Sequence, residues 1–118
     1  MPSARLRKQS KLLNAADFDR VFDKSVRSSD QYFTVLVRPN DLERPRLGMA
    51  ISKRRVKLAA GRNRLKRLVR ENFRLSEQNC SADYVVMAGK HGAVGTNQEL
   101  KKSLERHWEL LKKKCADF

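Results

Sequence analysis

Near the N-terminus, apolar side chains recur with the periodicity of a helix. Phe18, Val21 and Phe22 follow i, i+3, i+4 spacing, which predicts a short amphipathic helix over residues 15–24. Asn14 is a suitable N-cap for this helix, and an acid follows it three residues later, close to the capping-box pattern. The same periodicity returns twice further along the chain.

The second periodic segment covers residues 59–75. At about 100° per residue, its apolar side chains fall on one side and its basic side chains on the other. Gly61 lowers helix stability by about 1 kcal/mol relative to Ala, which favours a start just after it. The apolar side consists of Leu65, Leu68, Val69 and Leu75, with Phe73 at its edge.

The third periodic segment opens with a capping box formed by Thr96 and Glu99. Four apolar residues follow at i, i+4, i+8 and i+11, which predicts a last helix with one apolar stripe. We expect the stripe to lie in the core: Leu100, Leu104, Trp108 and Leu111.

Three apolar runs without helical periodicity predict strands. Residues 32–37 (YFTVLV) are rich in aromatic and β-branched side chains, and residues 47–52 (LGMAIS) follow a turn signal at residues 39–41. We expect these two runs to pair as a hairpin. Residues 84–88 (YVVMA) are too continuously apolar to alternate and suit a buried strand, and residues 89–95 form a glycine-containing loop.

The predicted order is α-β-β-α-β-α, with room for an additional short strand. It describes one small α+β domain, a two-layer α/β sandwich whose middle helix links two strands able to pair in parallel. The length of 118 residues suits a single domain, and 40% hydrophobic residues suffice for one modest core. We expect residues 1–11 to form a flexible basic arm ahead of it.

Composition restricts the class of protein. No apolar run approaches the ~20 residues that span a bilayer, and the N-terminus lacks the apolar stretch of a signal peptide. These observations favour a cytoplasmic protein. Cys80 and Cys115 show no CxxC or metal-ligand spacing, so we interpret them as free thiols, with one disulfide as the alternative.

The charge distribution indicates a polyanionic partner. The chain has 27 Lys and Arg against 13 Asp and Glu, a formal net charge of +14, and positions 44–74 hold twelve basic residues and one acid, Glu71. Each phosphate that such a surface neutralises releases counterions. We favour nucleic acid over a membrane surface because no stretch pairs a basic face with a broad apolar one.

Most of this charge lies on the helix predicted over residues 59–75. An ordinary solvated helix face would place Glu or Asp four residues from Lys or Arg, and only Glu71 does so. Arginine suits phosphate binding because its planar fork bonds two phosphate oxygens. Six basic residues occupy one arc: Arg62, Arg64, Lys66, Arg67, Arg70 and Arg74.

The motif Arg62-Asn63-Arg64 and the residues after it resemble the signature of the bacterial ribonuclease P protein subunit. Residues 13–22 are similar to the first helix of that family, residues 46–54 to a strand with a basic connection, and residues 83–86 to its last strand. These blocks, in this order and at this length, extend the resemblance over most of the chain.

The resemblance implies a fold whose one βαβ connection is left-handed, which is unusual. It also implies that a separate RNA subunit with bound Mg²⁺ hydrolyses the phosphodiester that joins the 5′ leader to precursor tRNA. The protein would bind that RNA and the leader, raising affinity for substrate and metal ions. The expected partners are ribonuclease P RNA and precursor tRNA, with no membrane and no obligate protein partner.

Carried over by position, the resemblance assigns two sets of site residues. Those expected to face the catalytic RNA are Arg62, Asn63, Arg64, Lys66, Arg67 and Arg70. Those expected to lie near the leader are Phe18, Phe22, Phe33, Lys53, Arg54 and Lys90.

The aromatic members of the leader set allow two interpretations. Single-stranded bases can stack on aromatic rings at roughly 1–3 kcal/mol each. Spacing alone favours a core role for Phe18 and Phe22, and a half-buried position satisfies both roles. Alternation puts Tyr32 and Phe33 on opposite faces, so it leaves open which of them faces the cleft. After the last strand, where the family usually has two adjacent basic residues, the chain reads Gly89-Lys90.

The sequence indicates no active site in the protein itself. Nothing in the spacing of His91 and His107 brings these two histidines together as acid and base, and the acids form no block that would hold two metal ions. We expect no catalytic residue and no metal site in the protein alone. Charge and size also suit a structural ribosomal protein or RNA chaperone, and a self-sufficient ribonuclease is the other competing class.

Overall fold

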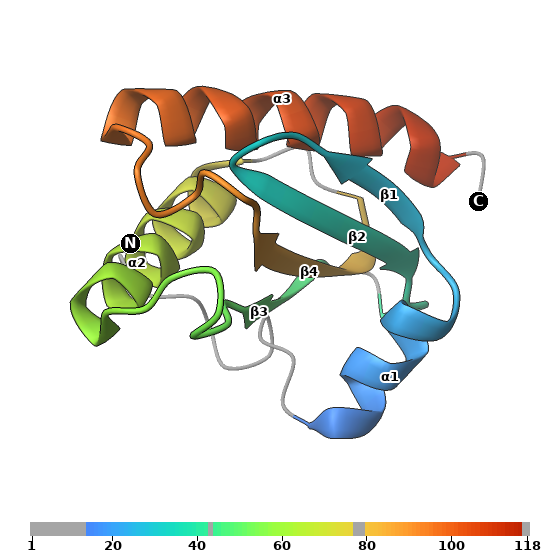
Figure 1. The fold of residues 1–118 in the computed structure, drawn as a ribbon. Coiled ribbons are helices and arrows are strands. Elements are labelled where there is room, and N and C mark those ends of the chain that lie inside the picture. The colour runs from blue at the N-terminus through green and yellow to red at the C-terminus, as the bar shows by residue number, and fades with distance from the viewer. Residues whose placement is uncertain (1–13, 43, 77–79, 117–118) are drawn as a thin grey trace, which may run out of the picture.

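The computed structural model describes residues 14–42, 44–76 and 80–116, in which three helices pack around one four-stranded sheet (Figure 1). The predicted N-terminal arm, residues 1–11, lies outside the described residues. In chain order the elements are α1 (Ala15–Asp23), β1 (Val26–Ser29), β2 (Phe33–Pro39), β3 (Arg46–Ala50), α2 (Ala59–Leu75), β4 (Ala82–Ala88) and α3 (Asn97–Ala116).

The four strands are arranged in the order β1-β2-β4-β3. β2 pairs antiparallel with both β1 and β4, and β3 pairs in parallel with β4. The predicted hairpin between residues 32–37 and 47–52 is therefore wrong, because β2 forms its hairpin with β1. The additional short strand is β1, and Asp30 holds its turn by accepting hydrogen bonds from the backbone N–H groups of Tyr32 and Phe33.

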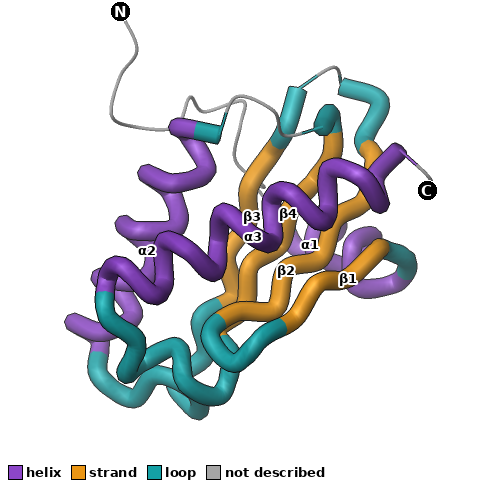
Figure 2. The backbone as a smooth tube through the Cα atoms, turned by 90° about the horizontal axis from the view of Figure 1, so that it is seen from above, coloured by secondary structure: helices purple, strands orange, loops and turns teal. Residues whose placement is uncertain are grey.

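Helices cover the two faces of the sheet unequally. Figure 2 shows α3 running across the strands on one face, with α1 behind them on the other. The main core lies on the α2 and α3 face and includes Val35, Tyr84 and Leu104. A smaller cluster of Val21, Leu36 and Val85 lies under α1. Because α1 is only nine residues long, no helix of the described residues covers much of its face of the sheet.

The helix predictions are largely confirmed. α2 covers the predicted periodic segment, residues 59–75, so the expectation that it starts just after Gly61 is wrong. α3 begins with the predicted reciprocal bonds between Thr96 and Glu99. The predicted apolar side of α2 is buried except for Leu75, which is 66% exposed at the end of the helix. The whole predicted stripe of α3 is buried: Leu100, Leu104, Trp108 and Leu111.

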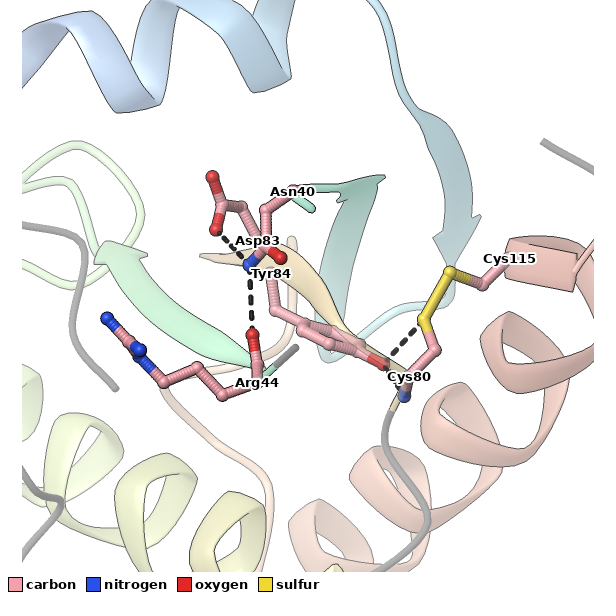
Figure 3. Close-up of a disulfide and its surroundings, with 6 residues drawn as sticks. All are labelled: Asn40, Arg44, Cys80, Asp83, Tyr84 and Cys115. Carbon is pink, nitrogen blue, oxygen red and sulfur yellow. Dashed lines mark hydrogen bonds between the residues drawn. A yellow bond between two sulfur atoms is a disulfide. The ribbon is translucent and has the colours of Figure 1, made fainter. Parts of the chain in front are cut away.

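Cys80 and Cys115 form a disulfide, which corrects the interpretation of these residues as free thiols (Figure 3). Their Cα atoms are 6.8 Å apart because the last turn of α3 returns to the segment just before β4. The Tyr84 hydroxyl accepts a hydrogen bond from the backbone N–H of Cys80, and burial raises the pKa of Tyr84 to about 12. The disulfide thus joins the end of α3 to the main core.

Candidate nucleic-acid interface

The basic arc of α2 consists of the six basic residues predicted to share one side, with Asn63 beside them: Arg62, Arg64, Lys66, Arg67, Arg70 and Arg74. It is held in a fixed orientation by the opposite side of the helix. Leu65 and Val69 are fully buried there, so the helix cannot turn without exposing core. Among the described residues, no carboxylate lies within 4.0 Å of a cationic group of α2. The arc therefore presents a positive charge that the described acids do not neutralise.

Two arginines of the arc also bind the loops on either side of the helix. The Nη1 of Arg62 donates to the carbonyl oxygens of Val56 and Lys57, each at 2.9 Å. The Nη2 of Arg64 donates to the carbonyl of Gly95 at 2.8 Å and to Oδ1 of Asn97 at 2.7 Å. The segment that Arg62 binds directly precedes α2, whereas no sequence pattern places residues 95–97 beside Arg64, so sequence reasoning could not find the second contact.

The basic residues predicted to lie near the leader lie beyond one edge of the sheet. Lys53 and Arg54 follow β3, and Lys90 follows β4. Because these two strands are parallel, their carboxyl ends lie at the same edge. All three side chains are exposed, so this edge carries cations from two separate loops.

Phe18 and Phe22 lie together on α1, with ring centroids 6.3 Å apart and an interplanar angle of 28°. Phe18 is partly buried against the Val21–Leu36–Val85 cluster, whereas Phe22 is 50% exposed. Phe18 thus contacts the smaller core while Phe22 is open to solvent, so the pair of rings is half-buried.

Phe33 does not meet the expectation that it lines the leader site. Its side chain is fully buried in the main core, on the α2 and α3 face of the sheet. Tyr32 also packs against that core, and its ring lies close to Gly95. The side chains of β2 and β4 that face α1 are instead Leu36 and Val85, followed towards the basic edge by partly buried Thr34 and Met87.

A buried ion-pair network fixes α1 against the opposite end of the sheet. Both guanidinium nitrogens of Arg46 that face Asp83, Nε and Nη2, lie 2.8 Å from its carboxylate oxygens. Arg46 Nη2 also lies 3.4 Å from Asp17 of α1, which in turn pairs with Arg20. Its hydrogen bonds with Asp83 raise the pKa of Arg46 above its ordinary value. Asp83 also accepts from Asn40 (Figure 3).

His107 lies in a second buried network, between α3 and β1. Its Nδ1 is 2.6 Å from Oγ of Ser28, and its Nε2 is 3.2 Å from a carboxylate oxygen of Asp30. Burial lowers the pKa of His107, although the carboxylate of Asp30 opposes this shift. For Asp30, burial favours the neutral form, but hydrogen bonds from Ser103, Phe33 and Tyr32 outweigh it and lower the pKa.

Stability should therefore decrease as the pH falls from 7.5 to 5.5. The unfolded chain, with a histidine pKa near 6.5, takes up a proton more readily than buried His107 does, so protonation favours unfolding by at most about 1.4 kcal/mol per pH unit. Asp30, whose pKa is lowered, keeps its negative charge throughout this range. Denaturant unfolding should show a smaller pH slope for His107→Gln.

The matched control for this measurement is His91→Gln, since His91 is exposed on the loop before α3. This variant should keep the slope of the unchanged protein. Equal slopes for both variants would contradict the assignment of the pH dependence to His107.

The described residues contain no group of three or more His, Cys, Asp or Glu side chains able to hold a metal ion. Their best-connected acids, Asp17 and Asp83, are already bound by arginines. His91 and His107 have separate surroundings, with Nδ1 of His91 lying 3.4 Å from Gln31. In the described segments, no helix combines the length and apolar character needed to cross a bilayer.

A fixed cationic helix, with an exposed aromatic ring on α1 and exposed basic side chains on the loops after β3 and β4, is typical of a small RNA-binding α+β protein. The family model for Ribonuclease P matches residues 6–112. The chain belongs to the ribonuclease P protein family: it is a subunit of that endoribonuclease, and its partner is the ribonuclease P RNA, which carries out the catalysis.

Individual relatives agree with this assignment. The ribonuclease P protein component of Methylococcus capsulatus is 45% identical over 107 residues, covering 90% of this chain and 84% of the relative. That of Photobacterium profundum is 42% identical, covering 88% and 89%. The Staphylococcus aureus RNase P protein structure has a TM-score of 0.81 at 28% identity, covering 87% of this chain and 95% of that one. For the Thermotoga maritima protein the TM-score is 0.73 at 28% identity, with coverage of 90% and 96%.

Proposed function

We propose that the basic arc of α2 binds the catalytic RNA while the α1 face of the sheet holds the 5′ leader of precursor tRNA. The observation that supports this proposal is that the cations of the basic arc are fixed in orientation and have no acidic partner among the described residues. Buried Leu65 and Val69 hold the helix in place, and no described acid lies within 4.0 Å of its cations. A rigid, unneutralised row of cations suits a folded polyanion.

The leader would lie between α1 and the basic edge of the sheet. Phe22 and partly buried Phe18 offer rings for bases to stack on, and Lys53, Arg54 and Lys90 are exposed beyond the strand ends, where phosphates could bind. From Val85 to Ala88 the strand extends about 10 Å, at roughly 3.3 Å per residue, which is enough for one or two nucleotides. Stacking and phosphate contacts read no base sequence, which suits an enzyme with many different substrates.

The RNA and the protein would contribute different parts of the activity. The RNA subunit would bind most of the Mg²⁺, which supplies the Lewis acid for phosphodiester hydrolysis. The protein would neutralise RNA phosphates, lowering the metal concentration that the complex needs, and would retain the leader. Such a complex would act in the cytoplasm, where precursor tRNA is made.

The test of this proposal is cleavage of precursor tRNA by protein alone, by RNA alone at high Mg²⁺, and by both at low Mg²⁺. We expect cleavage in the second and third reactions only. Activity of the protein alone, removed by His91→Ala or His107→Ala, would instead identify a self-sufficient ribonuclease.

Phe22→Ala should weaken binding of leader-bearing tRNA to the holoenzyme about tenfold, because one stacking contact is worth roughly 1–3 kcal/mol. Binding of mature tRNA should not change, since it has no leader. Phe22 is the sharper probe of the two rings because it is 50% exposed, so its removal leaves the core intact.

The matched control for Phe22→Ala is Leu110→Ala, which removes a 45% exposed apolar side chain from α3. It should leave both affinities unchanged, and Phe22→Tyr should bind like the unchanged protein because the ring remains. If Phe22→Ala weakened mature and precursor tRNA equally, the leader role would be wrong.

A further inference from the structure

A polar groove of about 450 Å³ lies between α2 and the first turns of α3. The residues that the resemblance assigns to the catalytic RNA all lie on α2, whereas α3 contributes the other wall of the groove. The polar lining is Asn63, Arg64, Arg67 and Glu71 from α2, with Asn97 and Lys101 from α3.

The α3 wall fixes one cation in place. Asn97 Oδ1 accepts from both Nε and Nη2 of Arg64, at 3.1 and 2.7 Å, and the Gly95 carbonyl accepts from Nη2 at 2.8 Å. No hydrogen bond between described residues uses Nη1 of Arg64. A guanidinium held in this way keeps a donor directed at a ligand without losing side-chain entropy on binding.

The charge of the groove favours an anion. Arg64, Arg67 and Lys101 contribute three cations against the single carboxylate of Glu71. Among the described residues, no acid lies within 4.0 Å of any of the three. Three cations that share an open groove without a carboxylate partner repel one another, and an anion between them relieves that repulsion.

The shape and lining of the groove favour a nucleic-acid backbone over a base. No aromatic side chain lines it, so it offers no stacking surface of the kind that Phe22 provides on α1. Its donors are guanidinium, ammonium and amide groups, which are those that bind phosphate oxygens. Glu71 lies one turn beyond Arg67 and would repel a phosphate there.

We infer that this groove binds a phosphodiester strand of the catalytic RNA, with Lys101 of α3 contacting a phosphate opposite Arg64 and Arg67. The inference rests on the proposed function and extends the RNA interface from α2 to a second helix. Asn97 acts through Arg64, which it orients.

The experiment compares Lys101→Ala with Lys102→Ala in binding to the ribonuclease P RNA over a range of salt concentrations. Both residues are exposed neighbours on α3 with the same charge, but only Lys101 lines the groove. Lys101→Ala should weaken binding about three- to fivefold, as expected for one exposed ion pair, and flatten the slope of log affinity against log salt by about 0.7–0.9. Lys102→Ala should do neither, and Glu71→Gln should tighten binding.

Arg67→Ala, measured in parallel, separates failure of this inference from failure of the proposed function. If it weakens RNA binding while Lys101→Ala and Lys102→Ala behave alike, the groove assignment is wrong and the α2 interface stands. If none of these variants changes binding, both are wrong. A loss for Lys101→Ala that appears only with precursor tRNA, and not with the catalytic RNA, would also overturn the inference.

Discussion

Asp83→Ala should lower the free energy of unfolding by about 3–5 kcal/mol, because it leaves the guanidinium of Arg46 buried without its main partner. Asp83 is 5% exposed and accepts two hydrogen bonds from Arg46 and one from Asn40. The melting temperature should fall by roughly 10 °C or more. Thermal and denaturant unfolding followed by circular dichroism would measure both quantities.

The matched control is Asp19→Ala, which removes an exposed acid from α1 and should change stability by less than about 0.5 kcal/mol. Replacing both partners, as Arg46→Met with Asp83→Leu, should recover part of the loss, since no unpaired charge then remains between them. Recovery should be incomplete because Asp17 also loses its contact with Arg46. A loss below 1 kcal/mol for Asp83→Ala would show that the network does not stabilise the fold.

Helices could be predicted from the sequence because their signals are local. The apolar and basic sides of α2 follow from one segment, and the capping box of Thr96 and Glu99 spans only four residues. Strand pairing depends on contacts between distant segments, and there the prediction was only partly right: the parallel pairing of the two strands joined by α2 is confirmed, whereas the hairpin between residues 32–37 and 47–52 is wrong. β1 has the sequence VRSS, with a single apolar residue, so its hydrophobic pattern does not predict a strand that pairs with β2.

The disulfide and the Arg46 network show the same limit. Cys80 and Cys115 are separated by 35 residues, and only the length and direction of α3 bring them together. Likewise, Arg46 and Asp83 meet because β3 and β4 pair in parallel with these two residues in register. Neither the disulfide nor the ion pair can be predicted from the spacing of residues along the sequence.

For the candidate site, the basic arc was predictable because all its members lie on one helix. Phe33 was expected to lie near the leader, but its side chain lies in the main core. Alternation separates the two faces of a strand but does not say which face α2 and α3 cover. The hydrogen bonds of Arg62 and Arg64 depend on the positions of the loops before α2 and before α3. These two arginines therefore serve the fold as well as any RNA that they contact, so other residues test the interface more cleanly.

Arg67 and Arg70 provide that test, and replacing both with alanine should weaken binding to the catalytic RNA about 30- to 100-fold. A charge-assisted hydrogen bond contributes roughly 1–1.5 kcal/mol at such a surface, and the double variant removes two. No hydrogen bond or ion pair between described residues engages either side chain, in contrast to Arg62 and Arg64. The melting temperature should therefore stay the same while the RNA affinity falls.

The salt dependence distinguishes phosphate contacts from a general loss of charge. The double variant should flatten the slope of log affinity against log salt by about 1.5, at roughly 0.7–0.9 for each phosphate released. The matched control is Lys102→Ala with Lys113→Ala, which removes two exposed charges from α3 outside the groove. Because long-range attraction depends on net charge, this control should cost little affinity and leave the slope nearly unchanged. Equal losses in the two double variants would mean that the RNA responds to net charge and not to the arc of α2.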